Sequence, residues 1–141
     1  MDNSIAARIL MLLSAGIILA LGLIHLAYTF RGSKLTPRDP ELQISMSRTS
    51  PVITRETTMW RCWVGFNASH SMGAILFGLV YGFLAVAHAR LLFDSLFLIA
   101  VGLGMLGGLF ALGKLYWFSI PFRSIGVALA CYLASIGVCL A

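Results

Sequence analysis

Residues 5–30 read IAARILMLLSAGIILALGLIHLAYTF, an almost unbroken apolar run in which Arg8 is the one charged residue. About 20 such residues are enough for a helix to cross the hydrocarbon core of a bilayer. The run is too long for the apolar part of a signal peptide. We therefore expect a membrane-spanning helix that is retained in the protein.

The rest of the chain has the same character, because 60% of its 141 residues are hydrophobic and only 11% are charged. An average soluble domain has about 25% charged residues. This chain has too little charge to cover a water-soluble globule and is too apolar for a disordered chain. Three cysteines are too few, and odd in number, for a disulfide scaffold. The composition predicts an integral membrane protein.

Three further apolar stretches follow the first, and each is close to the length of a bilayer span. The pattern predicts an all-α fold, an integral membrane four-helix bundle that forms a single transmembrane domain over residues 1–141. Asp94, at the start of the third stretch, is expected to cap that helix. The four predicted spans cover residues 5–30, 60–88, 94–115 and 119–141.

The basic residues are divided unevenly between the two sides of such a bundle. Segment 31–61 holds six Lys/Arg and three acids, a net charge of +3, and the turn with Lys114 and Arg123 lies on the same side. Only Arg8 and Arg90 lie on the other side. The positive-inside rule then places segment 31–61 in the cytoplasm and both termini in the periplasm. This charge suits an anionic membrane surface, and it is too sparse to indicate nucleic-acid binding.

The polar loop between the first two spans contains two helix-start patterns. Asp39-Pro40 and Ser50-Pro51 each place a capping residue before a proline at the first helical position. We expect two short amphipathic helices at the cytoplasmic membrane surface, the second of which runs on into the second span. A mobile linker is the alternative interpretation.

Four of the polar residues inside the first two spans are candidates for a site. Asn67, His70 and Ser71 are three and four residues apart, so they share one helix face. His25 lies on a matching stripe of the first span, and the two histidines differ in depth by about one helical turn. An unsatisfied polar group in an apolar interior costs on the order of a few kcal/mol. We therefore predict one shared ligand-binding site formed by His25, Asn67, His70 and Ser71.

Three interpretations of this polar site stay open. Its residues can serve structure alone, by hydrogen bonding across helices, or they can bind a small or lipid-like molecule. In the third interpretation His25 and His70 ligate haem or a metal. The sequence contains no haem or metal motif, and two histidines are too few for a closed metal site. No cofactor or metal is therefore assigned.

A catalytic role has weaker support, because Ser71 directly follows His70 and does not face it on a helix. The spans also offer no carboxylate that could orient a histidine base. We expect a small non-catalytic subunit or a small-molecule or lipid-binding protein. The alternative is a small membrane enzyme or haem protein that uses His25 and His70.

The third and fourth spans carry small residues at four-residue spacing, namely Gly104 with Gly108 and Gly126 with Ala130. This spacing predicts close helix packing in membranes. The contact can be made within the chain, with the helix of a membrane-protein partner, or with a second copy in a homo-oligomer.

Three runs of sequence carry a family resemblance: HLAYTFRGSKLTPRD at 25–39, TSPVITRETTMWR at 49–61 and GFNASHSMG at 65–73. They resemble a family of short four-helix bacterial inner-membrane proteins with a G-F-N-x-S-H-S motif, over most of residues 22–85. The resemblance implies four helices and a bacterial inner membrane. It implies no activity and no catalytic residue.

Overall fold

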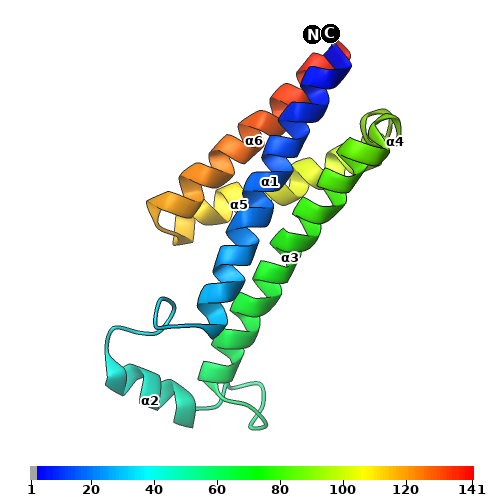
Figure 1. Cartoon of the computed structure of the whole chain (residues 1–141). Coiled ribbons are helices and arrows are strands. Elements are labelled where there is room, and N and C mark those ends of the chain that lie inside the picture. Colours follow the sequence, from blue (N-terminus) through cyan, green and yellow to red (C-terminus); the bar gives the residue numbers. More distant parts are fainter. Residues whose placement is uncertain (1–2) are drawn as a thin grey trace. The chain divides into compact units, whose positions relative to one another are not determined.

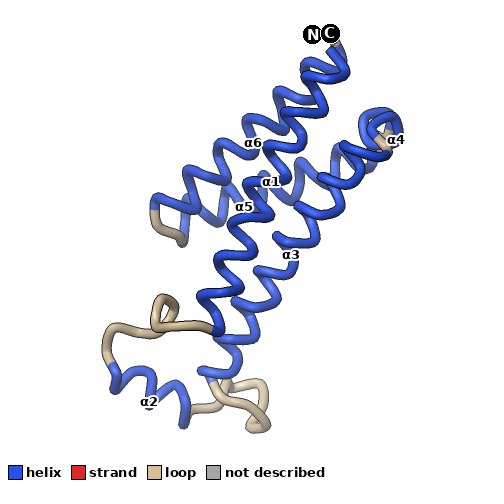
Figure 2. Tube along the Cα trace, viewed as in Figure 1, coloured by secondary structure: helices blue, strands red, loops and turns tan. Residues whose placement is uncertain are grey.

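The computed structural model describes residues 3–141, and over that range all of its regular structure is helical (Figures 1 and 2). Four helices, α1, α3, α5 and α6, are long and apolar enough to cross a membrane. This confirms the all-α class and the expected number of long apolar helices. The helices are α1 (Asn3–Phe30), α2 (Pro40–Arg48), α3 (Met59–Ala87), α4 (Ala89–Asp94), α5 (Leu96–Tyr116) and α6 (Ser119–Leu140).

The chain divides into two compact units. The first unit comprises residues 1–21 and 74–141, and the second unit comprises residues 22–73. The long helices α1 and α3 each contribute residues to both units. That the chain acts as a single transmembrane domain over residues 1–141 stays a prediction.

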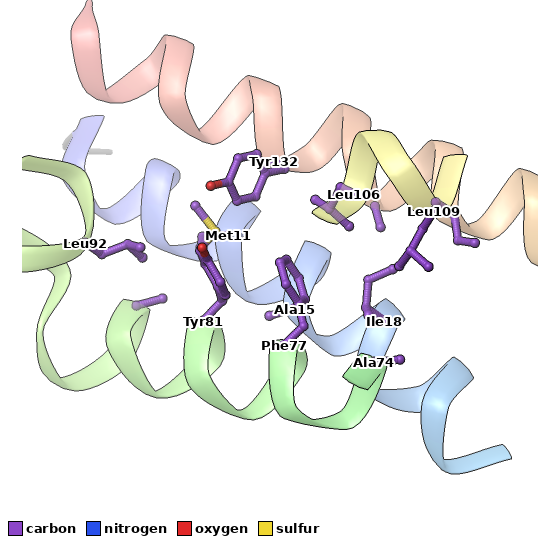
Figure 3. Close-up of a cluster of buried hydrophobic side chains, with 13 residues drawn as sticks. Met11, Ala15, Ile18, Ala74, Phe77, Tyr81, Leu92, Leu106, Leu109 and Tyr132 are labelled. Atoms are coloured by element: carbon purple, nitrogen blue, oxygen red, sulfur yellow. The ribbon is translucent and has the colours of Figure 1, made fainter. Parts of the chain in front are cut away.

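The apolar core lies within the first unit (Figure 3). The α1 residues in it recur every three or four positions, which is the spacing of one helix face. The largest core side chains come from five helices: Met11 and Ile18 of α1, Phe77 and Tyr81 of α3, Leu92 of α4, Leu106 and Leu109 of α5, and Ile125 and Tyr132 of α6.

Two tyrosine hydroxyls in this core donate hydrogen bonds to the backbone of α5. Tyr81 Oη donates to the carbonyl of Leu98 at 2.6 Å, and Tyr132 Oη donates to the carbonyl of Ile99 at 3.0 Å. The rings reach α5 because Gly102 has no side chain: a Cβ there would lie 2.7 Å from Tyr132 Cζ and 2.8 Å from Tyr81 Cε1. The bonds satisfy both hydroxyls, so the two rings can be buried in an apolar core.

The small residues that were expected to pack the third span against the fourth lie in different environments, some exposed and one in contact with α5. Helices α5 and α6 are in contact, but Gly104 and Gly108 lie exposed on α5, and a Cβ at either meets nothing within 4 Å. A Cβ at Gly126 would meet a phenylalanine ring of α5 at 3.3 Å, whereas Ala130 is exposed. Within residues 3–141, α5 meets α6 along the face that carries Gly102, and Gly126 takes part in this contact. That Gly104, Gly108 and Ala130 pack against another helix stays a prediction.

The predicted start of α2 is confirmed. Pro40 is its first residue, and the Asp39 carboxylate accepts a hydrogen bond of 2.9 Å from the backbone N–H of Glu41. Such a cap satisfies one of the free N–H groups at a helix start.

The second loop helix, expected to run from Pro51 into the second span, is absent, and that prediction was wrong. The N–H of Thr54 bonds to the carbonyl of Pro51 at 3.2 Å, and the Thr54 hydroxyl accepts the N–H of Glu56 at 3.2 Å. Local bonds of this kind compete with helix formation. Helix α3 instead begins at Met59, where Thr58 Oγ1 accepts the N–H of Arg61 at 3.3 Å.

The connection between α3 and α5 also differs from the sequence prediction. A short helix, α4, fills it, and α5 begins two residues later than expected. Ser95, not Asp94, caps α5, because Ser95 Oγ accepts the N–H of Leu98 at 3.3 Å. Asp94 is left exposed at the end of α4.

The close approach of α3 to α1 at Gly78 gives a stability prediction. A Cβ at Gly78 would lie 2.5 Å from Leu19 Cβ and 2.8 Å from the carbonyl oxygen of Ala15. We expect Gly78→Ala to lower the free energy of unfolding by about 1–3 kcal/mol, as overpacking does, which is measured by thermal unfolding in detergent.

Gly82→Ala is the matched control on the same helix. Its Cβ would lie at an ordinary 3.9 Å from Ala15 Cβ, and alanine favours helix over glycine. This variant should keep or raise the melting temperature. Equal melting temperatures for the wild type and Gly78→Ala would contradict the close contact.

Candidate binding site in the second unit

A hydrogen bond joins His25, near the end of α1, to Asn67 of α3, with His25 Nε2 at 3.0 Å from Asn67 Oδ1. The amide is oriented by its other end, because Asn67 Nδ2 donates to the carbonyl of Trp63 at 2.8 Å. An amide oxygen can only accept, so His25 Nε2 carries the proton of this hydrogen bond. This bond links the two long helices within the second unit.

The ring of His70 lies beside that of His25. Their centroids are 5.5 Å apart and the rings are nearly perpendicular, at 85°. On its other side the His70 ring lies parallel to Phe66, with centroids 6.5 Å apart. The structure thus brings together His25, Asn67 and His70. Asn67, His70 and Ser71, which were expected to share one face of a helix, follow one another at helical spacing on α3.

The hydroxyls of the cluster bond along their own helices. Ser71 Oγ donates to the carbonyl of Asn67 at 2.8 Å, and Thr29 Oγ1 donates to the carbonyl of His25 at 2.8 Å. These bonds satisfy the hydroxyls without help from a neighbouring helix. Ser71 is fully buried beside Asn67, and its side chain supports the cluster while the amide and the imidazole make the contact between helices.

A cleft of about 320 Å³ opens next to this cluster, between the end of α1, the following loop, α2 and the start of α3. Ligand pockets typically measure about 300–1,000 Å³. The residues around the cleft include no acid and no base. Aromatic and uncharged polar side chains dominate its wall, among them Tyr28, Trp60, Trp63, Thr36, Gln43 and Asn67.

Trp63 and Gly32 shape the loop that closes one side of the cleft. Trp63 Nε1 donates to the carbonyl of Leu35 at 3.0 Å, which fixes the loop against α3. Gly32 follows the end of α1 with φ at +80°, a conformation that glycine adopts at little cost. The chain can therefore turn sharply after α1 and return across the cleft.

The sequence did not identify these cleft residues as part of a site. Trp60 and Trp63 are typical of an interfacial aromatic belt, and Thr36 and Gln43 lie in the polar loop. The one available signal was the four-residue spacing of Trp63 and Asn67, which places them on the same helix face.

Within residues 3–141, no three His, Cys, Asp or Glu side chains come close enough together to hold a metal ion. His25 and His70, the two residues expected as haem ligands, lie beside each other. His25 Nε2 is engaged by Asn67, so ligation through that nitrogen would first require this hydrogen bond to break.

Comparison of the chain with protein-family models, curated proteins and solved structures finds no match. The similarity to inner-membrane proteins with a G-F-N-x-S-H-S motif stays a prediction from the sequence. The functional inference therefore depends on the geometry of the site.

The contact between His25 and Asn67 gives a second prediction. Asn67→Ala removes the acceptor of the His25 N–H. An unsatisfied donor costs about 1–3 kcal/mol when fully buried, and the partly buried His25 should approach the lower end of that range. We expect a correspondingly lower melting temperature in detergent.

Ser69→Ala is its control, because Ser69 is exposed on the same helix and its hydroxyl bonds only to the carbonyl of Phe66, at 2.9 Å. This variant should melt within the error of the wild type. If Asn67→Ala is as stable as Ser69→Ala, the hydrogen bond does not hold the helices.

Proposed function

We propose that this chain is a multi-pass protein of a bacterial inner membrane that binds a small or lipid-like molecule and does not catalyse a reaction. Membrane insertion is supported by the four long apolar helices and by large apolar side chains on their outer faces, such as Phe66 and Phe97, which are 69% and 74% exposed. A soluble monomer rarely exposes so much contiguous apolar surface. With 21 and 22 residues, α5 and α6 are about 32–33 Å long, close to the ~30 Å hydrocarbon core.

In this membrane the loop of residues 31–61 faces the cytoplasm and both termini face the periplasm. The supporting observation is the concentration of eight of the ten Lys/Arg on the loop side. A reporter fused to the C-terminus that is active only in the periplasm tests this orientation, and activity of a cytoplasmic reporter there contradicts it.

The position of Asn67 is the observation that carries the binding proposal. Asn67 lines the cleft and also accepts the hydrogen bond from His25. Its amide has two N–H donors and two acceptor lone pairs, and the bonds to His25 and Trp63 use one of each. A polar group in the cleft can therefore bond to an amide that is already held in place.

The uncharged wall of the cleft indicates the kind of molecule that fits it. An ion would lose hydration there without gaining a counter-charge, which is costly. The rings of Tyr28, Trp60 and Trp63 offer apolar surface beside polar groups. We therefore infer a ligand with an uncharged polar group attached to an apolar or ring portion.

The alternative function, a small membrane enzyme or haem protein using His25 and His70, has less support. Neither the cluster nor the wall of the cleft supplies a carboxylate to orient a histidine base. An absorption spectrum of the protein purified from membranes separates the two functions. A Soret band that disappears in His70→Ala would favour haem and contradict the proposed function.

Variants of the cleft test the binding proposal. We expect the protein purified in mild detergent to carry an uncharged lipid-like compound, detected by mass spectrometry of its organic extract. Gln43→Ala and Trp60→Ala should reduce the amount of this compound by about tenfold, the effect of losing one buried polar or aromatic contact.

Glu41→Ala is the matched control for Gln43→Ala. It also lies on α2, but it does not line the cleft, and it should leave the extract unchanged. The same extract from the wild type and all three variants would contradict binding in this cleft.

A role as a subunit is the second candidate, and the exposed face of α5 favours it. Gly104 and Gly108 are one turn apart on that face, and a Cβ at either would meet no atom of residues 3–141 within 4 Å. Small residues at this spacing let a second membrane helix approach closely. We therefore propose that a partner helix or a second copy packs here.

Leucine substitutions test this contact. Gly104→Leu and Gly108→Leu should reduce the size of the detergent-solubilised assembly, measured by light scattering, and leave the melting temperature of the monomer unchanged. Gly102→Leu is the contrasting variant, because its side chain would collide with Tyr132 inside the chain and should lower the melting temperature. An unchanged assembly size in both exposed variants would show that these glycines face lipid.

A further inference from the structure

A second, smaller cleft of about 120 Å³ lies in the first unit, between the start of α1, α4 and the end of α6. The two ends of the chain approach each other at this place, as Figure 1 shows for the start of α1 and the end of α6. Arg8 of α1 and Arg90 of α4 both line the cleft, with Asp94 one turn further along α4. The fold thus gathers one charged group of α1 and two charged groups of α4 around the same cleft.

These charged groups have no structural partner among the residues that the structure describes. Arg8, Arg90 and Asp94 take part in no ion pair or side-chain hydrogen bond there. Asp94 is also not needed as a helix cap, because Ser95 caps α5. Their charges are therefore available to a ligand.

The position of the two arginines within the sequence adds a second argument. In the proposed orientation they are the only Lys/Arg on the periplasmic side, where the positive-inside rule disfavours them. Both exceptions to the rule line the same small cleft. A shared ligand explains why both are there.

We propose that this cleft binds a phosphodiester head group that also carries a primary ammonium, as in phosphatidylethanolamine. The guanidinium groups of Arg8 and Arg90 bind the phosphate oxygens through charge-assisted hydrogen bonds. The Asp94 carboxylate accepts hydrogen bonds from the ammonium. Phe93 and Ala89, which also line the cleft, contact the apolar part of the lipid next to the head group.

The Asp94 carboxylate makes the cleft favour this head group over simpler anions. A free phosphate or an anionic head group would bind the arginines but would be repelled by the carboxylate beside them. A zwitterion that ends in an ammonium satisfies all three charges. This inference rests on the proposed membrane insertion and is independent of the cleft beside Asn67.

The test is lipid retention, measured by native mass spectrometry after exchange into detergent with equal amounts of phosphatidylethanolamine, phosphatidylglycerol and phosphatidylcholine. The wild type should retain phosphatidylethanolamine about tenfold over the other two, the effect of one charge-assisted contact. Arg8→Gln and Arg90→Gln should reduce the retention of all three phospholipids. Asp94→Asn should keep phospholipid bound and lose the preference for phosphatidylethanolamine.

Arg123→Gln is the control, because Arg123 is an exposed arginine of α6 that does not line the cleft; it should behave as the wild type. Equal retention of the three lipids by the wild type would overturn the proposal. Unchanged retention in the Arg8 and Arg90 variants, or an unchanged preference for phosphatidylethanolamine in the Asp94 variant, would also overturn it. A second arm adds millimolar inorganic phosphate. If phosphate binds in an Arg8- and Arg90-dependent way and no lipid is preferred, the ligand is free phosphate and the head-group proposal fails.

Membrane fractionation keeps this failure distinct from that of the proposed function. Recovery of the chain in the soluble fraction would contradict membrane insertion itself. Recovery in the membrane fraction with no lipid preference would overturn only the head-group site.

Discussion

The hydrogen bond between His25 and Asn67 is the interaction on which the second unit depends. It links two long helices, and it satisfies an imidazole N–H and an amide oxygen together. Without it, each group would carry the cost of a polar atom in apolar surroundings. The same bond fixes the orientation of Asn67, and the cleft beside Asn67 therefore has a polar group held in one position.

Helices α1 and α3 meet by different physical means in the two units. In the first unit Gly78 allows the backbones to approach, and dispersion contacts with Ala15 and Leu19 hold them. The hydroxyls of Tyr81 and Tyr132 there are satisfied by the backbone of α5. In the second unit the two helices are linked instead by the hydrogen bond between His25 and Asn67.

Much of the fold could be predicted from the sequence, since long apolar runs and the Asp39 cap are local signals. The shared face of Asn67 and His70 followed from helix periodicity, and its contact with His25 followed from the cost of leaving imidazoles unpaired. The absent helix after Pro51 depended on competing local hydrogen bonds, and the face on which α5 meets α6 depended on ring positions around Gly102. The cleft beside Asn67 depends on the path by which the loop after α1 returns to α3, and no periodic sequence pattern specifies that path.

The most direct test of the polar pair is ¹⁵N NMR of histidine-labelled protein in lipid nanodiscs. The structure predicts that His25 is the Nε2-protonated tautomer, with a slowly exchanging proton on Nε2 that exchanges rapidly in Asn67→Ala. A His25 signal from the Nδ1-protonated tautomer, or a rapidly exchanging Nε2 proton in the wild type, would contradict the hydrogen bond and the site built on it.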